Sequence, residues 1–220
     1  MKNIVGALSF LLALLGTGSS FAGTIKEYTA DMVDVKSEQV VNRYYIAEKK
    51  MRIDTFGAQG GRQGAKTKSD QPSGIAIIRL DQKKMYILQE DKTYIEMPIT
   101  DDKIENAMDM SKMFMGGTAP TRKVENLGTE TVSGYKAEKN RITTTIAMMG
   151  QKHTTTHTEW IAREFSMPVR MQEPNGRIME MRNIKTGAPS ASVFEMPAGY
   201  KRNTQMEEMM KSMQQKQKGK

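Results

Sequence analysis

Apolar and polar residues alternate with a period of two along most of the chain after residue 24, as in β-strands that bury one face. Short polar or glycine-containing stretches separate the alternating runs, which is typical of antiparallel strands joined by turns. We predict strands at residues 25–35, 39–48, 50–56, 74–80, 84–89, 93–97, 123–131, 135–146, 153–161, 167–173, 177–185 and 193–196. The stretch 57–73 has almost no apolar residue and is predicted as a long loop.

The strands at 74–80 and 84–89 are apolar on both faces rather than on one. Ile75 and Ile77 lie on one face of the first strand, whereas Ala76 and Ile78 lie on the other. Strands of this kind are covered on both faces. The sequence therefore predicts a further element packed over the sheet.

Residues 101–115 are the best helix candidate and the expected cover. Ile104, Met108 and Met115 fall on one stripe at helical spacing, and Gly116-Gly117 ends the pattern. The predicted fold class is mainly β (α+β): a strongly curved antiparallel sheet or open half-barrel of about ten strands, with a helical insert over its concave face.

The N-terminus predicts export to the periplasm by a cleaved signal peptide. Lys2 gives a positive start, residues 4–15 form a short apolar run, and Ser20 and Ala22 occupy the −3 and −1 positions of a cleavage site. The apolar run is shorter than the roughly 20 residues needed to cross a bilayer. We expect a signal peptide at 1–22, one domain at 23–202 and a flexible Met-, Gln- and Lys-rich tail at 203–220.

Composition narrows the class of partner. The chain has no cysteine, so neither a lipid anchor on cysteine nor disulfides are expected, and packing alone must hold the fold. The formal net charge is +8, which favours an anionic membrane surface or a simple solvated basic surface. Nucleic acid is not expected, because no concentrated basic and aromatic stripe is present.

No catalytic pattern is found in the sequence. His153 and His157 are the only histidines, and on a strand they stand roughly 13 Å apart at about 3.3 Å per residue, which is too far to share a metal ion. The loop at 57–67 lacks the Gly-Lys-Thr order of a phosphate loop, and no serine lies in a nucleophile elbow. We predict that the protein is not an enzyme and has neither a cofactor nor a metal site.

Methionine is unusually frequent, with 20 residues in the chain. Met108, Met110, Met113 and Met115 cluster in the predicted helix, and a second cluster lies in the tail. Methionine lines adaptable apolar grooves, which favours a groove or core role for the helix cluster. Thioethers also bind Cu(I), so a copper-binding function stays open as an alternative.

Several stretches resemble the LolA/LolB-type superfamily of periplasmic lipoprotein carriers, and more narrowly its uncharacterised exported branch. The resemblance is carried, in order, by residues 28–56, 78–98, 124–136, 160–161 with 167–170, and 194–200. It implies a curved antiparallel sheet wrapped over helices, with an apolar cavity for acyl chains. The carriers have an Arg-Pro pair near the end of an early strand where this chain reads Lys49-Lys50-Met51, so lipoprotein carriage itself is not implied.

Together these features predict a non-enzymatic periplasmic binding or carrier protein that shelters an apolar ligand, lipid or acyl chains, between sheet and helix. Expected partners are a hydrophobic small molecule or lipid, with a membrane surface or a lipoprotein as further candidates. The alternatives are a Met-rich copper-binding or stress protein and a sensor or scaffold that docks a protein. The predicted groove residues are Ile77, Met85, Ile87, Ile104, Met108, Met115 and Trp160.

Overall fold

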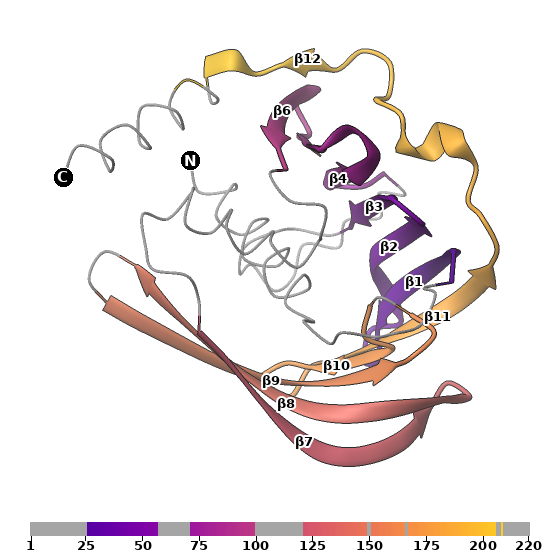
Figure 1. Ribbon diagram of the computed structural model, residues 1–220, viewed down its shortest axis with the longest axis vertical. Coiled ribbons are helices and arrows are strands. Elements are labelled where there is room, and N and C mark those ends of the chain that lie inside the picture. The colour runs from indigo at the N-terminus through magenta and orange to yellow at the C-terminus, as the bar shows by residue number, and fades with distance from the viewer. Residues whose placement is uncertain are drawn as a thin grey trace.

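The computed structural model describes residues 26–56, 71–99, 121–148, 151–165, 167–205 and 208, and its strands form one twelve-stranded sheet (Figure 1). The strands are β1 (Tyr28–Asp34), β2 (Gln39–Ala47), β3 (Lys50–Thr55), β4 (Gly74–Arg79), β5 (Lys84–Leu88), β6 (Thr93–Pro98), β7 (Thr121–Val132), β8 (Tyr135–Met148), β9 (Gln151–Ala162), β10 (Arg170–Gln172), β11 (Ile178–Thr186) and β12 (Lys201–Arg202). Within the described residues two short 3₁₀ helices, η1 (Leu80–Gln82) and η3 (Ala191–Phe194), accompany them.

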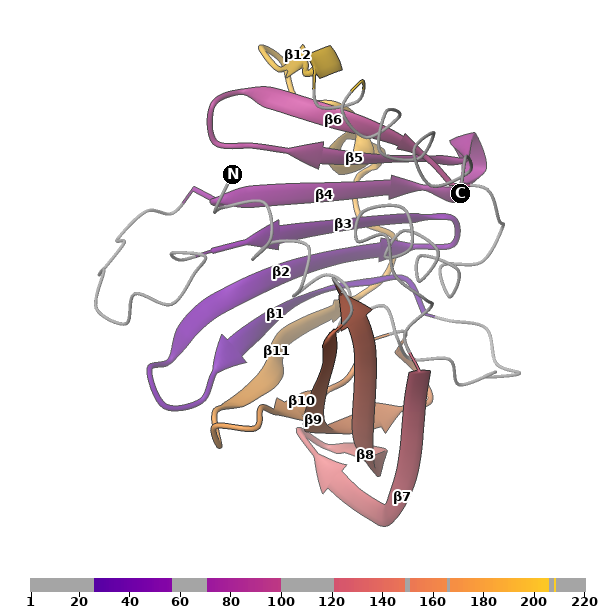
Figure 2. The same ribbon diagram turned by 90° about the vertical axis from the view of Figure 1, so that its left-hand side faces the viewer.

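The strand order across the sheet is β12-β6-β5-β4-β3-β2-β1-β11-β10-β9-β8-β7. All neighbours are antiparallel except β12, which pairs in parallel with β6. Neighbours in the sheet are mostly neighbours in sequence, but β1 pairs with β11 and so joins the first and last thirds of the chain. In Figure 2 strands β1 to β6 run across the view, whereas β7 to β9 run steeply down it.

The period-two pattern predicted the strands well. The first eleven predicted strands are confirmed, and Gly176 takes the positive φ of +85° that the predicted hairpin turn at 174–176 requires. The strand predicted at 193–196 is wrong: its first half belongs to η3, and the short strand β12 follows it instead. Residues 191–194 alternate too briefly to separate a strand from one turn of 3₁₀ helix.

The coarse fold class is confirmed, since the described chain is mainly β and its sheet is mostly antiparallel. The strong curvature that we predicted is not found. The sheet is open, and its strands change direction through the usual right-handed twist of roughly 20–25° between neighbours. The predicted helix at 101–115 and the signal peptide at 1–22 lie outside the described residues.

Both faces of the sheet are buried around β4, as the sequence predicted. On one face Ile75, Ile77 and Leu88 pack with tyrosines of β5 and β6 and with Met196 and Tyr200, so we call it the C-terminal face. The opposite face carries most of the core. We call it the methionine face after the buried methionines of its strands, which are Met32, Met51, Met85, Met97, Met171, Met179 and Met181; Met167, between β9 and β10, belongs to the same cluster.

Candidate functional site

The methionine face is a predominantly apolar face that spans β1 to β6, β10 and β11. None of its seven methionines is more than 4% exposed. The register sets Met32 opposite Met181, Met85 opposite Met97, and Met171 opposite Met179, so these thioethers lie in cross-strand pairs. Unbranched, polarisable side chains in this arrangement can repack around contents of varying shape. The face therefore has the composition of an adaptable apolar binding surface.

Two buried polar side chains, Asn42 and Tyr44, interrupt this apolar surface near the middle of the sheet. They lie two residues apart on β2, so they share the methionine face, and they are 1% and 0% exposed. The register places Asn42 opposite Met32 and Tyr44 opposite Ile53. Within the described part of the chain, no hydrogen bond of ordinary geometry reaches either amide atom of Asn42 or the hydroxyl of Tyr44, although the two side chains are close enough for Asn42 to act on the Tyr44 hydroxyl as a weak hydrogen-bond partner.

The environment of Tyr44 keeps its phenol neutral. Burial raises the pKa of Tyr44 well above its ordinary value of 10, although the neighbouring Asn42 side chain acts in the opposite direction. A buried donor or acceptor without a partner typically costs about 1–3 kcal/mol of stability. The Asn42–Tyr44 pair is therefore a costly polar feature of this face, and a bound polar group would relieve that cost.

A second polar group lies where the methionine face continues onto β7, β8 and β9. Glu159 is 1% exposed; its Oε1 accepts a hydrogen bond of 2.8 Å from Arg122. Its Oε2 has no hydrogen-bond partner among the described residues and lies 3.6 Å from Nε2 of His157. Asn140 stands opposite Glu159 in the register, and Met171 stands opposite it on the other side. The face thus changes from apolar to polar between β10 and β9.

The two polar groups are separated by the methionines of β1, β10 and β11. From Asn42 on β2 to Glu159 on β9 the path crosses four strand spacings of about 4.8 Å, or about 19 Å along the sheet. A long apolar molecule could lie along this path over Met32, Met181, Met179 and Met171. The site is therefore best described as a methionine-lined strip with a neutral polar pair at one end and a charged cluster at the other.

Of the predicted groove residues, the structure brings Met85 and Ile87 together on the methionine face. Met85 is buried opposite Met97, and Ile87 is half-buried opposite Ile95. Ile104, Met108 and Met115 lie outside the described residues. The predicted set therefore identified one edge of this face, and it missed Asn42, Tyr44 and Glu159 at its polar points.

Ile77 lies on the opposite side of the sheet from Met85. The register pairs Ile77 with Tyr86, and both belong to the C-terminal face. Ile77 is 0% exposed there, within the cluster that includes Met196 and Tyr200. Its role in this structure is to hold the C-terminal segment against the sheet.

Trp160 belongs to the same buried cluster as the methionines, although the register places it on the other side of β9 from the methionine face. It stands opposite Lys139 and Arg170 in the register, on the other side of β9 from Glu159. Its Nε1 donates a 2.7 Å hydrogen bond to Glu130, and the cationic groups of Lys139 and Arg170 lie 5.0 and 5.6 Å from the ring. These contacts complete the hydrogen-bonding and cation–π environment of a structural tryptophan.

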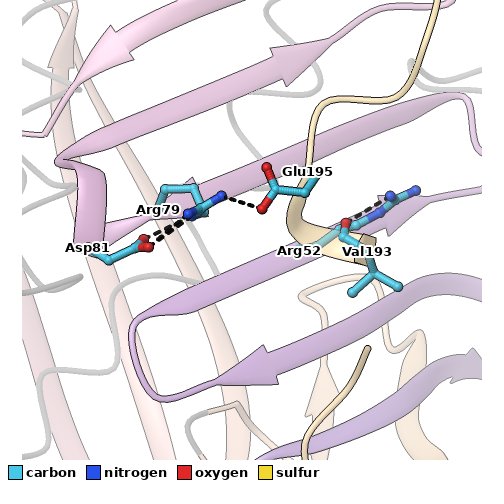
Figure 3. A network of polar contacts seen from close by, with 5 residues as sticks. All are labelled: Arg52, Arg79, Asp81, Val193 and Glu195. Carbon is cyan, nitrogen blue, oxygen red and sulfur yellow. Dashed lines mark hydrogen bonds and ion pairs between the residues drawn. The ribbon is translucent and has the colours of Figure 1, made fainter. Parts of the chain in front are cut away.

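A network of arginines holds the C-terminal segment over the C-terminal face (Figure 3). Arg79 of β4 makes a two-pronged contact with Asp81 and donates a 2.9 Å hydrogen bond to Glu195. Arg52 of β3 donates to the carbonyl of Val193 at 3.0 Å. The hydrogen bond from Arg79 also holds the pKa of Asp81 below its ordinary value. The chain is thus attached to the sheet at two points, once within η3 at Val193 and once directly after it at Glu195.

Within the described ranges, no group of three or more His, Cys, Asp or Glu side chains is arranged to hold a metal ion. Across the same ranges, no helix has the length and apolar character needed to span a bilayer.

The sequence comparisons place the chain in one family. Residues 21–166, more than half of the chain, match the family described as Domain of unknown function (DUF4412), and the protein belongs to that family. A search of curated proteins finds no significant match to the sequence.

Among solved structures, one titled "Structure of PNGF-II in P21 space group" is similar over 84% of this chain and 33% of that chain. The sequence identity is 9% and the TM-score is 0.46, a level at which the similarity carries no argument. The chain spans 33% of the length of that protein.

Proposed function

We propose that this protein is a non-enzymatic, exported binding protein that shelters an apolar ligand, lipid or acyl chains, against the methionine face. The observation that carries the proposal is the strip of paired methionines with unpartnered, buried polar side chains set into it. Burial of apolar surface would drive binding at about 25 cal/mol per Å², and the few polar groups would orient the ligand.

Features of the sequence extend this proposal to the compartment and the fold family. The signal-like N-terminus supports action in the periplasm after cleavage near residue 22. The resemblance to the LolA/LolB-type carriers supports a hydrophobic cargo, and it supports residues 101–115, with Ile104, Met108 and Met115, as a helical cover of the site. Because Ile77 and Trp160 lie on the other side of the sheet, they are not part of the proposed site.

The proposal is tested with N-phenyl-1-naphthylamine, an uncharged probe whose fluorescence rises in apolar surroundings. We expect saturable uptake by the wild-type protein and a loss of at least tenfold in affinity for Ile87→Asn. The matched control is Tyr86→Asn, the next residue on β5, which is also half-buried but lies on the C-terminal face. If wild type takes up no probe, or both variants lose uptake equally, the proposed site is refuted.

Native mass spectrometry of protein purified from its own compartment distinguishes the remaining functions. Copurified lipid supports the carrier function. A bound copper ion would support the second candidate, which is favoured by the paired thioethers Met32–Met181 and Met171–Met179 on one face. Protein without any ligand would support a sensor or scaffold that docks a protein partner.

A further inference from the structure

The polar pair on β2 carries information about the chemistry of the ligand, and this inference rests on the proposed function. Asn42 and Tyr44 lie side by side on an otherwise apolar part of the methionine face, with Met32 and Ile53 as cross-strand neighbours. Both are at least 99% buried, and apart from a weak interaction with each other their three polar side-chain atoms have no partner of ordinary hydrogen-bond geometry within the described residues. In folded proteins such atoms are almost always paired, with protein, water or ligand.

The two side chains together define what could satisfy them. The Asn42 amide offers both a donor and an acceptor, and the Tyr44 hydroxyl can act as either. Neither side chain carries charge near neutral pH. A carboxylate or an ammonium group placed beside them would lose its hydration without gaining an opposite charge from this pair, which is strongly unfavourable in an apolar site. The pair therefore suits an uncharged group that forms hydrogen bonds.

We infer that the ligand of the methionine face is an apolar molecule bearing an uncharged hydrogen-bonding group, such as a hydroxyl, ester or amide, which is bound by Asn42 and Tyr44. The apolar body lies over Met32 and its neighbours towards β10. The site then disfavours two classes of ligand. Hydrocarbons leave the polar atoms of Asn42 and Tyr44 unsatisfied, and ionised amphiphiles lose the hydration of their charged group.

The test compares four twelve-carbon compounds as competitors of bound N-phenyl-1-naphthylamine. These are 1-dodecanol, 1-chlorododecane, dodecanoate and dodecylammonium at pH 7.5, each below its aggregation concentration. We expect 1-dodecanol to displace the probe at a concentration about tenfold lower than any of the other three. Equal displacement by all four would overturn the inference while leaving the proposed function standing, whereas absence of probe uptake would refute the proposed function itself.

Variants then assign the preference to the two residues. Asn42→Leu and Tyr44→Phe keep most of the side-chain volume and remove the polar atoms. Each is expected to reduce the preference for 1-dodecanol to about threefold or less, and binding of 1-chlorododecane should be unchanged. The control is Tyr45→Phe, the adjacent residue of β2 on the opposite face, beside Arg52. A preference that survives in the Asn42→Leu, Tyr44→Phe double variant overturns the inference.

A thermal readout separates ligand recognition from a structural role. Removing polar groups that have no partner should leave the melting temperature of the ligand-free protein unchanged or raise it. If instead Tyr44→Phe and Asn42→Leu both lower the melting temperature by more than about 5 °C, the two groups are paired in the folded protein and the inference is overturned.

Discussion

At the level of single residues, Trp160 shows most clearly how charges surround an apolar side chain here. Its Nε1 donates to Oε2 of Glu130, and Nζ of Lys139 binds Oε1 of the same carboxylate at 2.6 Å. These hydrogen bonds hold the pKa of Glu130 below its ordinary value of 4.5, and the one from Lys139 has the larger effect. Glu130 therefore stays ionised, and stays bonded to the indole, in moderately acidic solution.

This arrangement predicts an acid transition in tryptophan fluorescence. Because the pKa of Glu130 is lowered in the folded state, its stabilising contribution is present above pH 4.5 and is lost as the pH falls through the lower, folded value. Trp160 is the only tryptophan, so the emission of folded protein should change with a midpoint below pH 4.5. Glu130→Gln should abolish the transition.

The control for that titration is Glu125→Gln, which removes an exposed carboxylate bonded to Arg141 on the same strand pair. It should leave the midpoint unchanged. Circular dichroism recorded in parallel identifies any unfolding. A fluorescence midpoint at or above pH 4.5 in folded protein would contradict the assignment.

Single residues also explain why part of the site prediction from the sequence was wrong. Ile77, Met85 and Ile87 come from strands that are apolar on both faces, so alternation within each strand does not say which face of β4 matches which face of β5. The register decides this, and a shift of one residue exchanges the faces. Asn42 and Glu159 were missed because a polar residue in an alternating strand is normally assigned to the solvent face. The sequence alone does not distinguish a polar residue that points into the core from one that points to solvent.

At the level of elements, the segment that follows β11 depends on a few arginines. Arg79 is buried, and it bridges Asp81 and Glu195 (Figure 3). Arg79→Met should lower the free energy of unfolding by about 1–3 kcal/mol, since it leaves two carboxylates without their cation. Urea denaturation measures the loss, and hydrogen exchange should increase in residues 191–203.

A matched substitution tests whether the stability lost in Arg79→Met depends on the burial of Arg79. Arg141 forms an ion pair with Glu125 in which both side chains are about half exposed. Arg141→Met should change the free energy of unfolding by no more than about 0.5 kcal/mol. Equal effects of the two substitutions would show that Arg79 does not anchor the C-terminal segment.

Most strands have five or more residues and were recognised from alternation because several consecutive positions agree, and the three-residue β10 was recognised within a longer alternating run. β12 has two residues, and it exists because backbone groups of β6 are available: the amides of Lys201 and Asn203 donate to Lys92 and Tyr94. No local pattern in residues 201–203 encodes that pairing, since the partner supplies the hydrogen bonds.

For the whole molecule, these contacts define how far the chain must extend to complete the described sheet. Tyr200 packs on the C-terminal face, and Asn203 donates the last described backbone hydrogen bond to β6. Truncation after Gln205 should therefore shift the melting temperature by less than about 2 °C. Truncation after Gly199 should lower it by at least about 5 °C, since it removes β12 and an aromatic contact.

Differential scanning calorimetry of both truncated proteins provides the comparison. A large loss of stability on removing residues 206–220 would show that the tail contributes to the folded domain. A Gly199 truncation as stable as the full chain would show that β12 is dispensable.

The pairing of β1 with β11 has a consequence for biosynthesis. These strands are about 150 residues apart in sequence, so a chain emerging N-terminus first presents β1 to β6 long before the partner of β1 exists. Until residues 178–186 arrive, β1 is an unpaired edge with an apolar face, a species prone to pair with other chains. Closing so long a loop is also slow. The nascent chain should therefore need a holding chaperone until its last third is available, and this need is set by strand order rather than by the stability of the finished fold.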